Sequence, residues 1–250
     1  MNRKLVAALA CRNQGSRLYG KPLQNLCIEK RITVLDYIIS WMKTIPEIDQ
    51  VVLGIAEGNH NLAFVDYCKD KNIPFITGNE IDVLERLIKC GELEAATDIF
   101  RVTSESPFTY YEAIGPAWQD HVEGGFDFTC LDFVPDGSGF EIITLNALQQ
   151  SHENGSIKHR SELCSLFIRE NADGFRMNQI EPPADVKRTD IRLTIDFPED
   201  LVLCRAVYAH FRERAPKIPL NEILQFLDSR PDLKALVDPF IDEGLKTMYL

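Results

Sequence analysis

The sequence predicts an α/β protein whose mostly parallel sheet carries helices on both faces. Its 250 residues include 45% hydrophobic and 26% charged side chains, which is typical of a soluble globular protein and argues against disorder or a fibrous repeat. Short apolar segments alternate with longer amphipathic ones, as strands do with crossover helices. Neither an internal repeat nor a low-complexity segment interrupts this pattern. In such a fold, ligands bind at the carboxyl ends of the strands.

The alternation is clearest in the first half of the chain. The apolar runs that we interpret as strands are 5–11, 51–55, 74–76, 99–102 and 126–130. Between them, apolar residues recur on one face of an expected helix; these helices are 34–43, 61–71, 82–90 and 110–122.

The pattern changes after residue 130. A turn at Pro135-Asp136-Gly137 precedes an apolar segment at 140–143 and helices near 145–151 and 161–169. We interpret this part as an excursion that leaves the sheet and returns as a strand over 191–195. Pro198-Glu199-Asp200 then opens an apolar helix through 210, because proline is tolerated and acidic residues are favourable in a first helical turn. The remaining residues predict short helices broken by prolines.

Charge and cysteine usage restrict the classes of partner and compartment. With 38 acidic and 27 basic residues, the formal charge is −11, so nucleic acid and anionic membranes are not expected as partners. The seven cysteines contain no Cys-x-x-Cys pair, which indicates reduced thiols and a cytoplasmic protein. The first ten residues hold an apolar run too short for a signal peptide or a membrane span.

A basic loop follows the first expected strand. It reads Cys11-Arg12-Asn13-Gln14-Gly15-Ser16-Arg17-Leu18-Tyr19-Gly20-Lys21-Pro22-Leu23. Glycine lets the backbone approach a phosphate, and Arg and Lys neutralise a polyphosphate that an acidic protein otherwise repels. The loop therefore predicts a triphosphate site, although it is neither a Walker A nor a GxGxxG motif. A surface loop with ordinary basic residues is the alternative.

Four further segments of the chain match motifs of one known family, in the same order and at a similar spacing as in that family. They are 78–86, Arg101-Val102-Thr103-Ser104-Glu105-Ser106-Pro107-Phe108, Pro135-Asp136-Gly137 with Glu141, and Arg192-Leu193-Thr194-Ile195-Asp196-Phe197-Pro198-Glu199-Asp200. Together with the loop, they resemble the cytidylyltransferases that activate acidic sugars. The likeness is greatest to the spore-coat polysaccharide (SpsF-like) branch, related to the 3-deoxy-manno-octulosonate and acylneuraminate enzymes. It covers residues 1 to about 212, and five ordered segments are more specific than any single motif.

The resemblance implies a Rossmann-like, nucleotide-diphospho-sugar transferase (GT-A type) fold. It also implies transfer of CMP from CTP to an anionic sugar or a related small acid or phosphate, with release of pyrophosphate, in surface glycan precursor synthesis. We expect a nucleotidyltransferase domain over 1–212, with 130–190 as its acceptor-side excursion, and a helical tail over 213–250. Relatives tend to form homodimers, and the apolar segment between 135 and 148 is the expected contact.

The same resemblance assigns roles to individual residues. The catalytic residues are Lys21, Arg12, Glu105 and Asp196, and Glu105 and Asp196 hold Mg²⁺. The nucleotide-binding residues are Cys11, Arg12, Gln14, Gly15, Ser16, Arg17, Lys21, Asp82 and Arg86. The acceptor-binding residues are Asp136, Glu141, Arg160 and Arg192. A pair of carboxylates suits Mg²⁺, which takes few protein ligands besides phosphate oxygens and must neutralise charge on the α-phosphate and pyrophosphate.

Other interpretations stay open. Glu105 and Asp136 could be ordinary turn residues, and Asp196 could be a helix N-cap. The chain also departs from the family pattern, with Ser104-Glu105 in place of Gly-Asp, Phe197 in place of Thr, Leu163 in place of His and Tyr19 in place of Pro. These departures lie mostly on the acceptor side.

Two rival functions follow. The first is a nucleotide-binding homologue without turnover that acts as a sensor or scaffold in glycan biosynthesis. The second is a glycosyltransferase that uses a premade nucleotide sugar. The second is disfavoured because the sequence contains no Asp-x-Asp pair.

Overall fold

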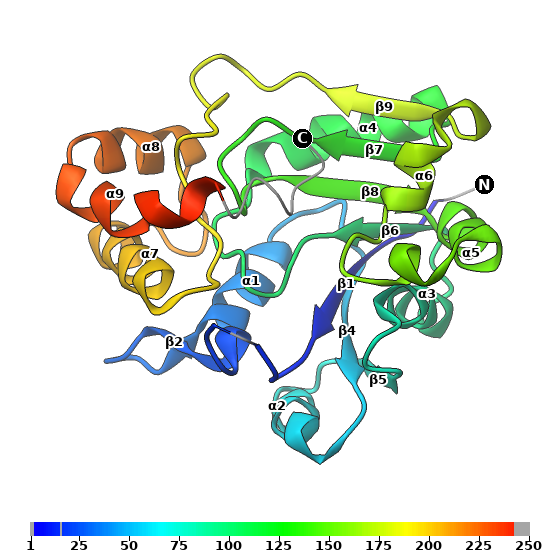
Figure 1. Ribbon diagram of the computed structural model, residues 1–250, viewed down its shortest axis with the longest axis horizontal. Helices are drawn as coiled ribbons and strands as arrows, with labels where there is room; N and C mark the ends of the chain where they lie inside the picture. Colours follow the sequence, from blue (N-terminus) through cyan, green and yellow to red (C-terminus); the bar gives the residue numbers. More distant parts are fainter. Residues whose placement is uncertain (1–2, 16, 243–250) are drawn as a thin grey trace.

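A twisted seven-stranded sheet forms the centre of the computed structural model, which describes residues 3–15 and 17–242 (Figure 1). In these residues the strand order is β5-β4-β1-β6-β8-β7-β9. The strands are β1 (Leu5–Cys11), β4 (Gln50–Ala56), β5 (Phe75–Gly78), β6 (Asp98–Arg101), β7 (Phe128–Leu131), β8 (Phe140–Thr144) and β9 (Met177–Ile180). A separate ribbon pairs β2 (Asn25–Cys27) with β3 (Ile32–Thr33).

The sheet is mostly parallel, as the sequence predicts. Strands β5, β4, β1 and β6 pair in parallel, and β7 pairs in parallel with β9. Of the seven strands described in this sheet, only β8 runs the other way, antiparallel to both β6 and β7. The chain winds outward from β1 to β4 and β5, then crosses back to β6 on the other side of β1. Such a reversal opens a crevice at the carboxyl ends of the two strands that flank it.

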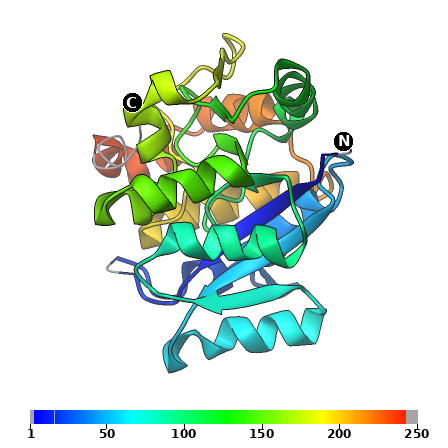
Figure 2. The same ribbon diagram turned by 90° about the vertical axis from the view of Figure 1, so that its right-hand side faces the viewer.

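Helices cover both faces of the sheet. The described helices are α1 (Val34–Met42), α2 (Leu62–Lys71), α3 (Val83–Leu93), α4 (Ile114–Gly124), α5 (Leu145–Asn154), α6 (Leu166–Glu170), α7 (Pro198–Phe211), α8 (Leu220–Asp228) and α9 (Pro231–Val237). Helices α3 and α5 lie on the face seen in Figure 2 and share a core with α6. The other helices pack on the opposite face. The helices expected in the first half all form, with ends shifted by a few residues.

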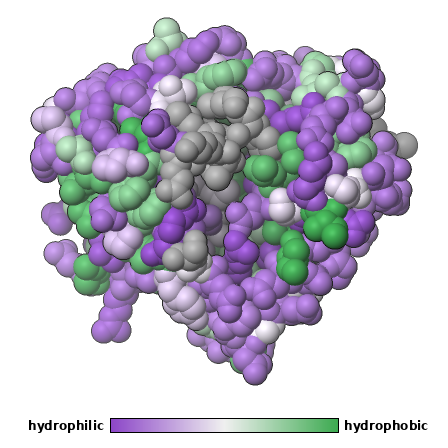
Figure 3. Space-filling model, viewed as in Figure 1, coloured by the Kyte–Doolittle hydropathy of each residue, from purple (hydrophilic) through white to green (hydrophobic). Residues whose placement is uncertain are grey.

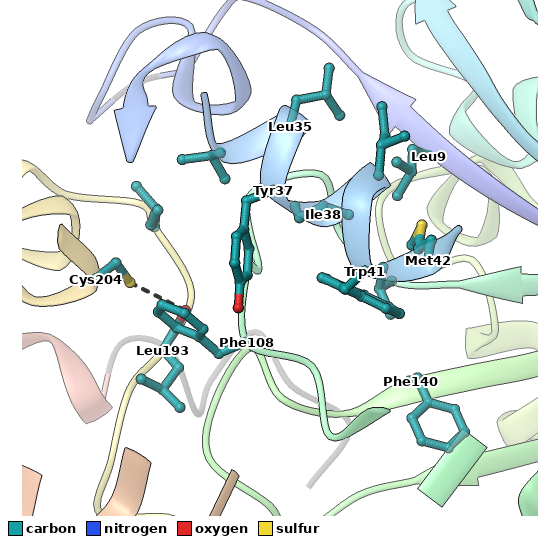
Figure 4. Packing of buried hydrophobic residues seen from close by; sticks show 14 of the residues in the cluster. Leu9, Leu35, Tyr37, Ile38, Trp41, Met42, Phe108, Phe140, Leu193 and Cys204 are labelled. Carbon is teal, nitrogen blue, oxygen red and sulfur yellow. Dashed lines mark hydrogen bonds between the residues drawn. The ribbon is translucent and has the colours of Figure 1, made fainter. Parts of the chain in front are cut away.

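Helix α1 is the centre of the larger core. Its Tyr37 ring lies edge-on to Phe108 at 5.6 Å between centroids, and its Trp41 ring lies edge-on to Phe100 of β6 at 6.3 Å. Figure 4 shows the Tyr37 side chain extending from α1 toward Phe108, in the loop after β6, and toward the segment that carries Leu193. This packing secures the loops that leave the carboxyl ends of β1 and β6.

Two expectations for the second half of the chain are wrong. Residues 140–143 do not leave the sheet but form β8 in its interior. The apolar segment 135–148 is therefore largely buried within the chain, and the dimer contact expected there stays a prediction. Residues 191–195 do not return as a strand: apart from one bridge between Asp136 and Arg192, they run as a buried extended segment. Their backbone bonds the loops at Asp136 and Glu105, because the segment crosses beyond the strand ends.

The strand that completes this half of the sheet, at the edge beside β7, is β9 instead. Its four residues are only partly buried or exposed, so no apolar run marks them in the sequence. The helix expected over 161–169 begins only at Leu166 and is α6, because residues 161–163 form a loop at the mouth of a cavity.

The described part of the tail packs against the main body rather than apart from it. Helices α8 and α9 contact α7 (Figure 1), and Ile223, Leu227 and Val237 join the larger core. The last residues of the expected tail, 243–250, lie outside the described range.

The visible surface is largely hydrophilic, with hydrophobic side chains in small separate groups (Figure 3). None of the helices in the described parts of the chain is long and apolar enough to cross a membrane. The homodimer and the cytoplasmic location stay predictions.

Candidate active site

The candidate site lies at the reversal of strand order, where loops leave the carboxyl ends of β1 and β6. The Ser104 hydroxyl, in the loop after β6, donates to the carbonyl of Ala10 in β1 at 2.9 Å and joins the two strand ends. The segment 191–195 crosses the same place through the bond from the Ile195 N–H to the Glu105 carbonyl at 3.1 Å. Three distant parts of the chain therefore meet here.

The basic loop after β1 is a closed turn. The N–H of Gly20 donates to the Asn13 carbonyl at 2.9 Å, and Gly20 has a φ of 60°, which glycine adopts without strain. The Asn13 N–H in turn donates to the side chain of Asn61 at 2.7 Å. A Cβ at Gly15 would lie 2.6 Å from the Leu18 carbonyl oxygen, so the loop also needs glycine there. Ser16, predicted to bind the nucleotide, lies outside the described residues.

A lysine joins the two predicted metal ligands. The ammonium Nζ of Lys21 lies 2.6 Å from Oδ1 of Asp196 and 3.9 Å from Oε1 of Glu105. Nη2 of Arg17 lies 3.5 Å from the same Asp196 oxygen. Two predicted cations and two predicted acids thus form one cluster, and the third cation, Arg12, pairs with Glu162 across the cavity.

Arg192 lies behind this cluster. Its side chain is 1% exposed and bonds Asp136, Asp196 and Asp200, with its Nε 3.0 Å from Oδ1 of Asp200. The Asp196 carboxylate is therefore held between Arg192 on the buried side and Lys21 on the cavity side. Asp196 is not the N-cap of α7, because the N-cap position is Phe197 and the Asp196 carboxylate bonds Lys21 and Arg192 instead.

The acids of the site differ in pKa. Burial favours protonation of Asp196, but Lys21 and Arg192 outweigh it and lower the pKa of this carboxyl below its usual value. Burial raises the pKa of Glu105, against the opposing effect of Lys21. Burial also raises the pKa of Asp136 to about 6, although Arg192 favours its ionised form. Lys21 and Arg192 thus hold Asp196 as an anion among acids that burial makes harder to ionise.

Two adjoining cavities open over the cluster. The smaller, of about 150 Å³, is lined by the basic loop, including Gln14, Gly15, Arg17 and Lys21. The larger, of about 720 Å³, shares Arg12, Gln14, Arg17, Glu105 and Asp196 with it and extends to β7, β8 and the loop at 161–163. The cluster therefore lies where the two cavities meet.

The far end of the larger cavity is built from charge pairs. Glu141 of β8 bonds Nη1 of Arg101 at 2.7 Å and Nη2 of Arg169 at 3.2 Å. Arg169 also bonds Asp132 at 2.9 Å. Burial raises the pKa of Glu141, but Arg101 and Arg169 outweigh it and lower that pKa below its usual value.

Several predicted residues do not line either cavity. Cys11 is fully buried, and burial raises the pKa of its thiol, so it is a neutral core group. Asp82 caps α3 by accepting from the Glu85 N–H at 2.8 Å. Arg160 bonds the His152 carbonyl at 3.1 Å, and Arg192 is the buried residue described above. Asp136 and Glu141 do line the larger cavity.

Arg86 lines the smaller cavity but is itself 1% exposed. Its Nη1 donates to the carbonyls of Gly54 at 2.7 Å and Cys11 at 3.3 Å. Through these bonds Arg86 ties β4 to the end of β1, immediately before the basic loop.

Sequence reasoning missed several polar residues of the larger cavity, among them Arg101, Thr103, Asp132 and Glu162. Arg101 and Thr103 stand inside a segment used for the resemblance, at the carboxyl end of an expected strand. Because ligands bind at the carboxyl ends of the strands, this position could have identified Arg101 and Thr103 as site residues. Asp132 had a similar signal, because it lies just after the expected strand 126–130. Glu162 carried none, because it lies in the excursion and next to no expected strand.

Comparisons with known proteins agree with this geometry. The sequence profile of the cytidylyltransferase family matches residues 7–234. The spore coat polysaccharide biosynthesis protein SpsF of Bacillus subtilis is 25% identical over 230 residues, covering 91% of this chain and 95% of that protein. An uncharacterized protein of Methanocaldococcus jannaschii is 27% identical over 234 residues, covering 92% and 93%.

Solved structures share the fold. A cytidylyltransferase from Leptospira borgpetersenii superposes with a TM-score of 0.83 at 18% identity, covering 93% of this chain and 97% of that one. A CMP:2-keto-3-deoxy-manno-octonic acid synthetase, solved with CTP, superposes with a TM-score of 0.64 at 14% identity, covering 83% and 99%. Since the family profile spans most of the chain, and the basic loop, the lysine–carboxylate cluster and both cavities fall within it, the chain belongs to the cytidylyltransferase family of CTP-dependent nucleotidyltransferases.

Proposed function

We propose that this protein transfers CMP from CTP to an oxygen of a small anionic acceptor, a sugar acid or a related acid or phosphate, and releases pyrophosphate, in the synthesis of surface glycan precursors. One observation carries the proposal: Lys21, Glu105 and Asp196, from three separate parts of the chain, converge where the two cavities meet. The similarity to SpsF, which is named as a spore coat polysaccharide biosynthesis protein, supports the glycan role.

The smaller cavity suits the triphosphate of CTP. Its glycine-containing wall allows close approach of phosphate, and Arg17 and Lys21 supply positive charge in an otherwise acidic protein. Arg12 borders the same space. Its partner Glu162 is 66% exposed, and an ion pair so open to water contributes little. The Arg12 guanidinium can therefore exchange this partner for a phosphate.

Glu105 and Asp196 fit Mg²⁺ as a pair of oxygen ligands. In the described part of the chain, no cluster of three or more His, Cys, Asp or Glu side chains is placed to hold a metal ion. The donor set thus suits an ion that takes its other ligands from phosphate and water, as Mg²⁺ does. When bound, Mg²⁺ neutralises charge on the α-phosphate and on the departing pyrophosphate.

The reaction we propose is an in-line displacement. The acceptor oxygen forms a bond to the α-phosphorus of CTP, the bond from that phosphorus to the bridging oxygen breaks, and pyrophosphate leaves with the electron pair. Lys21 and Arg17 orient the triphosphate and stabilise the charge that develops on it. A phosphate or phosphonate acceptor is already anionic at neutral pH, so its attack needs no general base, whereas a sugar hydroxyl must give its proton to a base or to water as the new bond forms.

The larger cavity supplies the acceptor site. Arg101 lines it and is the group that we assign to the negative charge of the acceptor. The acids at its far end are already neutralised, Glu141 by Arg101 and Arg169, and Asp132 by Arg169. These carboxylates therefore repel an anionic acceptor less than unpaired carboxylates would.

The test is pyrophosphate release with each nucleoside triphosphate, Mg²⁺ and a panel of ulosonic acids, sugar phosphates and phosphonates. We expect release with CTP and one class of acceptor. Lys21→Ala should lower kcat/KM by about 10²-fold or more, which is typical for loss of one group that stabilises transition-state charge. Lys89→Ala is the matched control, since Lys89 forms an exposed ion pair with Glu85 at 2.8 Å on α3.

Two results would contradict the proposal. Binding of CTP without pyrophosphate release for any acceptor would favour the sensor or scaffold interpretation. Full activity of a folded Lys21→Ala variant would show that the lysine of the cluster does not take part in the reaction.

A further inference from the structure

Two aromatic rings stack beside the lysine–carboxylate cluster. Phe197 follows Asp196 directly and precedes α7, and Phe240 belongs to a 3-10 turn, Asp238–Phe240, that follows α9. Their ring centroids are 3.9 Å apart and their planes differ by 14°. The packing of α9 against α7 brings the two rings together (Figure 1).

Phe197 also contacts the triphosphate loop. The guanidinium carbon of Arg17 lies 4.8 Å from the centroid of the Phe197 ring, within the range of a cation–π interaction. The same guanidinium reaches Asp196 at 3.5 Å. Because the Phe240 ring already covers one face of Phe197 at 3.9 Å, Arg17 contacts the remaining surface of that ring.

The contacts form a chain from the C-terminal tail to the site: Phe240, Phe197, Arg17. Phe197 is also the position at which the sequence departs from the threonine of the resembled motif, so the stack is a feature of this chain. We propose that Phe240 is a positioning residue for nucleotide binding, which stacks on Phe197 and so holds the surface against which the Arg17 guanidinium rests.

The physical effect is pre-organisation. A free arginine side chain samples many rotamers, and ordering it when the ligand binds reduces affinity. A guanidinium already held on an aromatic ring avoids part of this cost. Phe240 touches neither the reacting atoms nor the ligand, so its loss should weaken CTP binding and leave the chemical step nearly unchanged.

The experiment measures CTP affinity by calorimetry with Mg²⁺ and without acceptor, together with KM and kcat. Phe240→Ala should weaken CTP binding and raise KM about three- to tenfold, the factor that corresponds to a cation–π contact at a partly exposed site, with kcat changed less than about twofold. Phe240→Tyr, which keeps the ring, should restore the affinity. Phe240→Leu keeps apolar bulk but has no ring, so it should weaken CTP binding as much as Phe240→Ala does. It therefore tests the proposal even if the alanine variant unfolds.

Phe226→Ala is the matched control. Phe226 is also a half-buried phenylalanine of the tail, but it stacks on His210 at 4.2 Å. Its removal should leave CTP affinity unchanged. In an Arg17→Ala background, Phe240→Ala should have no further effect, because both residues act through the same guanidinium.

The inference rests on the proposed function, in which Arg17 holds the triphosphate. Absence of CTP binding by the unaltered protein would overturn both. Normal CTP binding that Phe240→Ala and Phe240→Leu leave unchanged would overturn the inference alone. An equal loss of affinity in Phe226→Ala, or a full additional loss in the Arg17→Ala background, would also overturn it.

Discussion

Asp200 is the buried acid that supports Asp196, one of the two proposed metal ligands. It is 1% exposed, and its carboxylate accepts from Nε of Arg192 at 3.0 Å. It also accepts from the backbone N–H groups of Asp196 and Phe197 at 2.8 and 2.9 Å. These bonds orient the backbone that presents Asp196 to the cavity, as outer groups orient metal ligands in other proteins.

Asp200→Asn tests this supporting role. The neutral amide leaves the buried Arg192 undercompensated and replaces an acceptor oxygen by a donor. We expect a loss of about 3 kcal/mol in the free energy of unfolding and a fall in activity of about 10- to 100-fold. Urea denaturation and pyrophosphate release measure the two effects.

Asp228→Asn is the control: it removes an exposed ion pair with Arg188, and it should lower the free energy of unfolding by less than about 1 kcal/mol with no loss of activity. Unchanged activity in a folded Asp200→Asn variant would contradict the prediction.

The loop at 135–138 and the extended segment at 191–195 are the elements that bring Asp136 and Asp196 together. They are held by backbone bonds from the Leu193 N–H to the Asp136 carbonyl at 2.7 Å and from the Asp136 N–H to the Ile191 carbonyl at 3.1 Å. Gly137 permits this close crossing, since its φ is 89° and a Cβ there would lie 2.5 Å from the backbone nitrogen of Thr194.

Gly137→Ala should therefore push the two segments apart. We expect a loss of stability of about 2 kcal/mol or more, from backbone strain and a clash with backbone atoms. Activity should fall by about tenfold or more, because small displacements of catalytic groups are costly. Gly174→Ala serves as the control, since a Cβ at Gly174 meets nothing within 4 Å. Equal stability of the two variants would show that the crossing tolerates a side chain.

The strands and helices of the first half could be predicted from sequence because each carries its own signal. Strand β1 is a continuous apolar run, and α1 begins at a Thr33–Asp36 capping box. The segment 191–195 misled the prediction because its buried residues pack on loops rather than beside a strand. Strand β9 was missed because a partly exposed edge strand needs no apolar alternation.

Asp98 connects distant parts of the chain at the amino end of β6, whereas the candidate site lies at the carboxyl ends of the strands. It is fully buried at the start of β6, where Nε of Arg3 donates to it at 2.8 Å and Nε2 of His121 in α4 lies 3.2 Å away. Burial alone raises the pKa of Asp98, but the bonds with His121 and Arg3 outweigh it and hold that pKa below its usual value. The carboxylate therefore stabilises the fold at pH values above the ordinary pKa of aspartate, about 4.

Stability should accordingly depend on pH through Asp98. Because its pKa is lower in the folded than in the unfolded protein, its contribution is lost as the pH falls through the folded value. Asp98→Asn should lower the free energy of unfolding at pH 7 by about 3 kcal/mol, and the difference from the unaltered protein should shrink below about pH 4. Urea denaturation at several pH values measures it, with the exposed Asp70→Asn as the control. A difference that is the same at pH 3 and pH 7 would refute the assignment.

The linear sequence was sufficient for the fold class, the first-half elements and the basic loop. Each of these follows from neighbours along the chain: apolar runs, helical periodicity, and glycines and cations directly after a strand. Lys21, Glu105 and Asp196 could be named because each stands in a short motif that resembles the family's pattern.

The partners of those residues depended on folding. That Lys21 contacts Asp196, that Arg192 is buried behind it and that Phe240 stacks on Phe197 are relations between residues distant in the chain. The sheet order and the packing of α9 on α7 bring them together, and no local pattern encodes those distances. Charge and burial at the site are therefore properties of the folded molecule, because both depend on which distant groups surround each side chain.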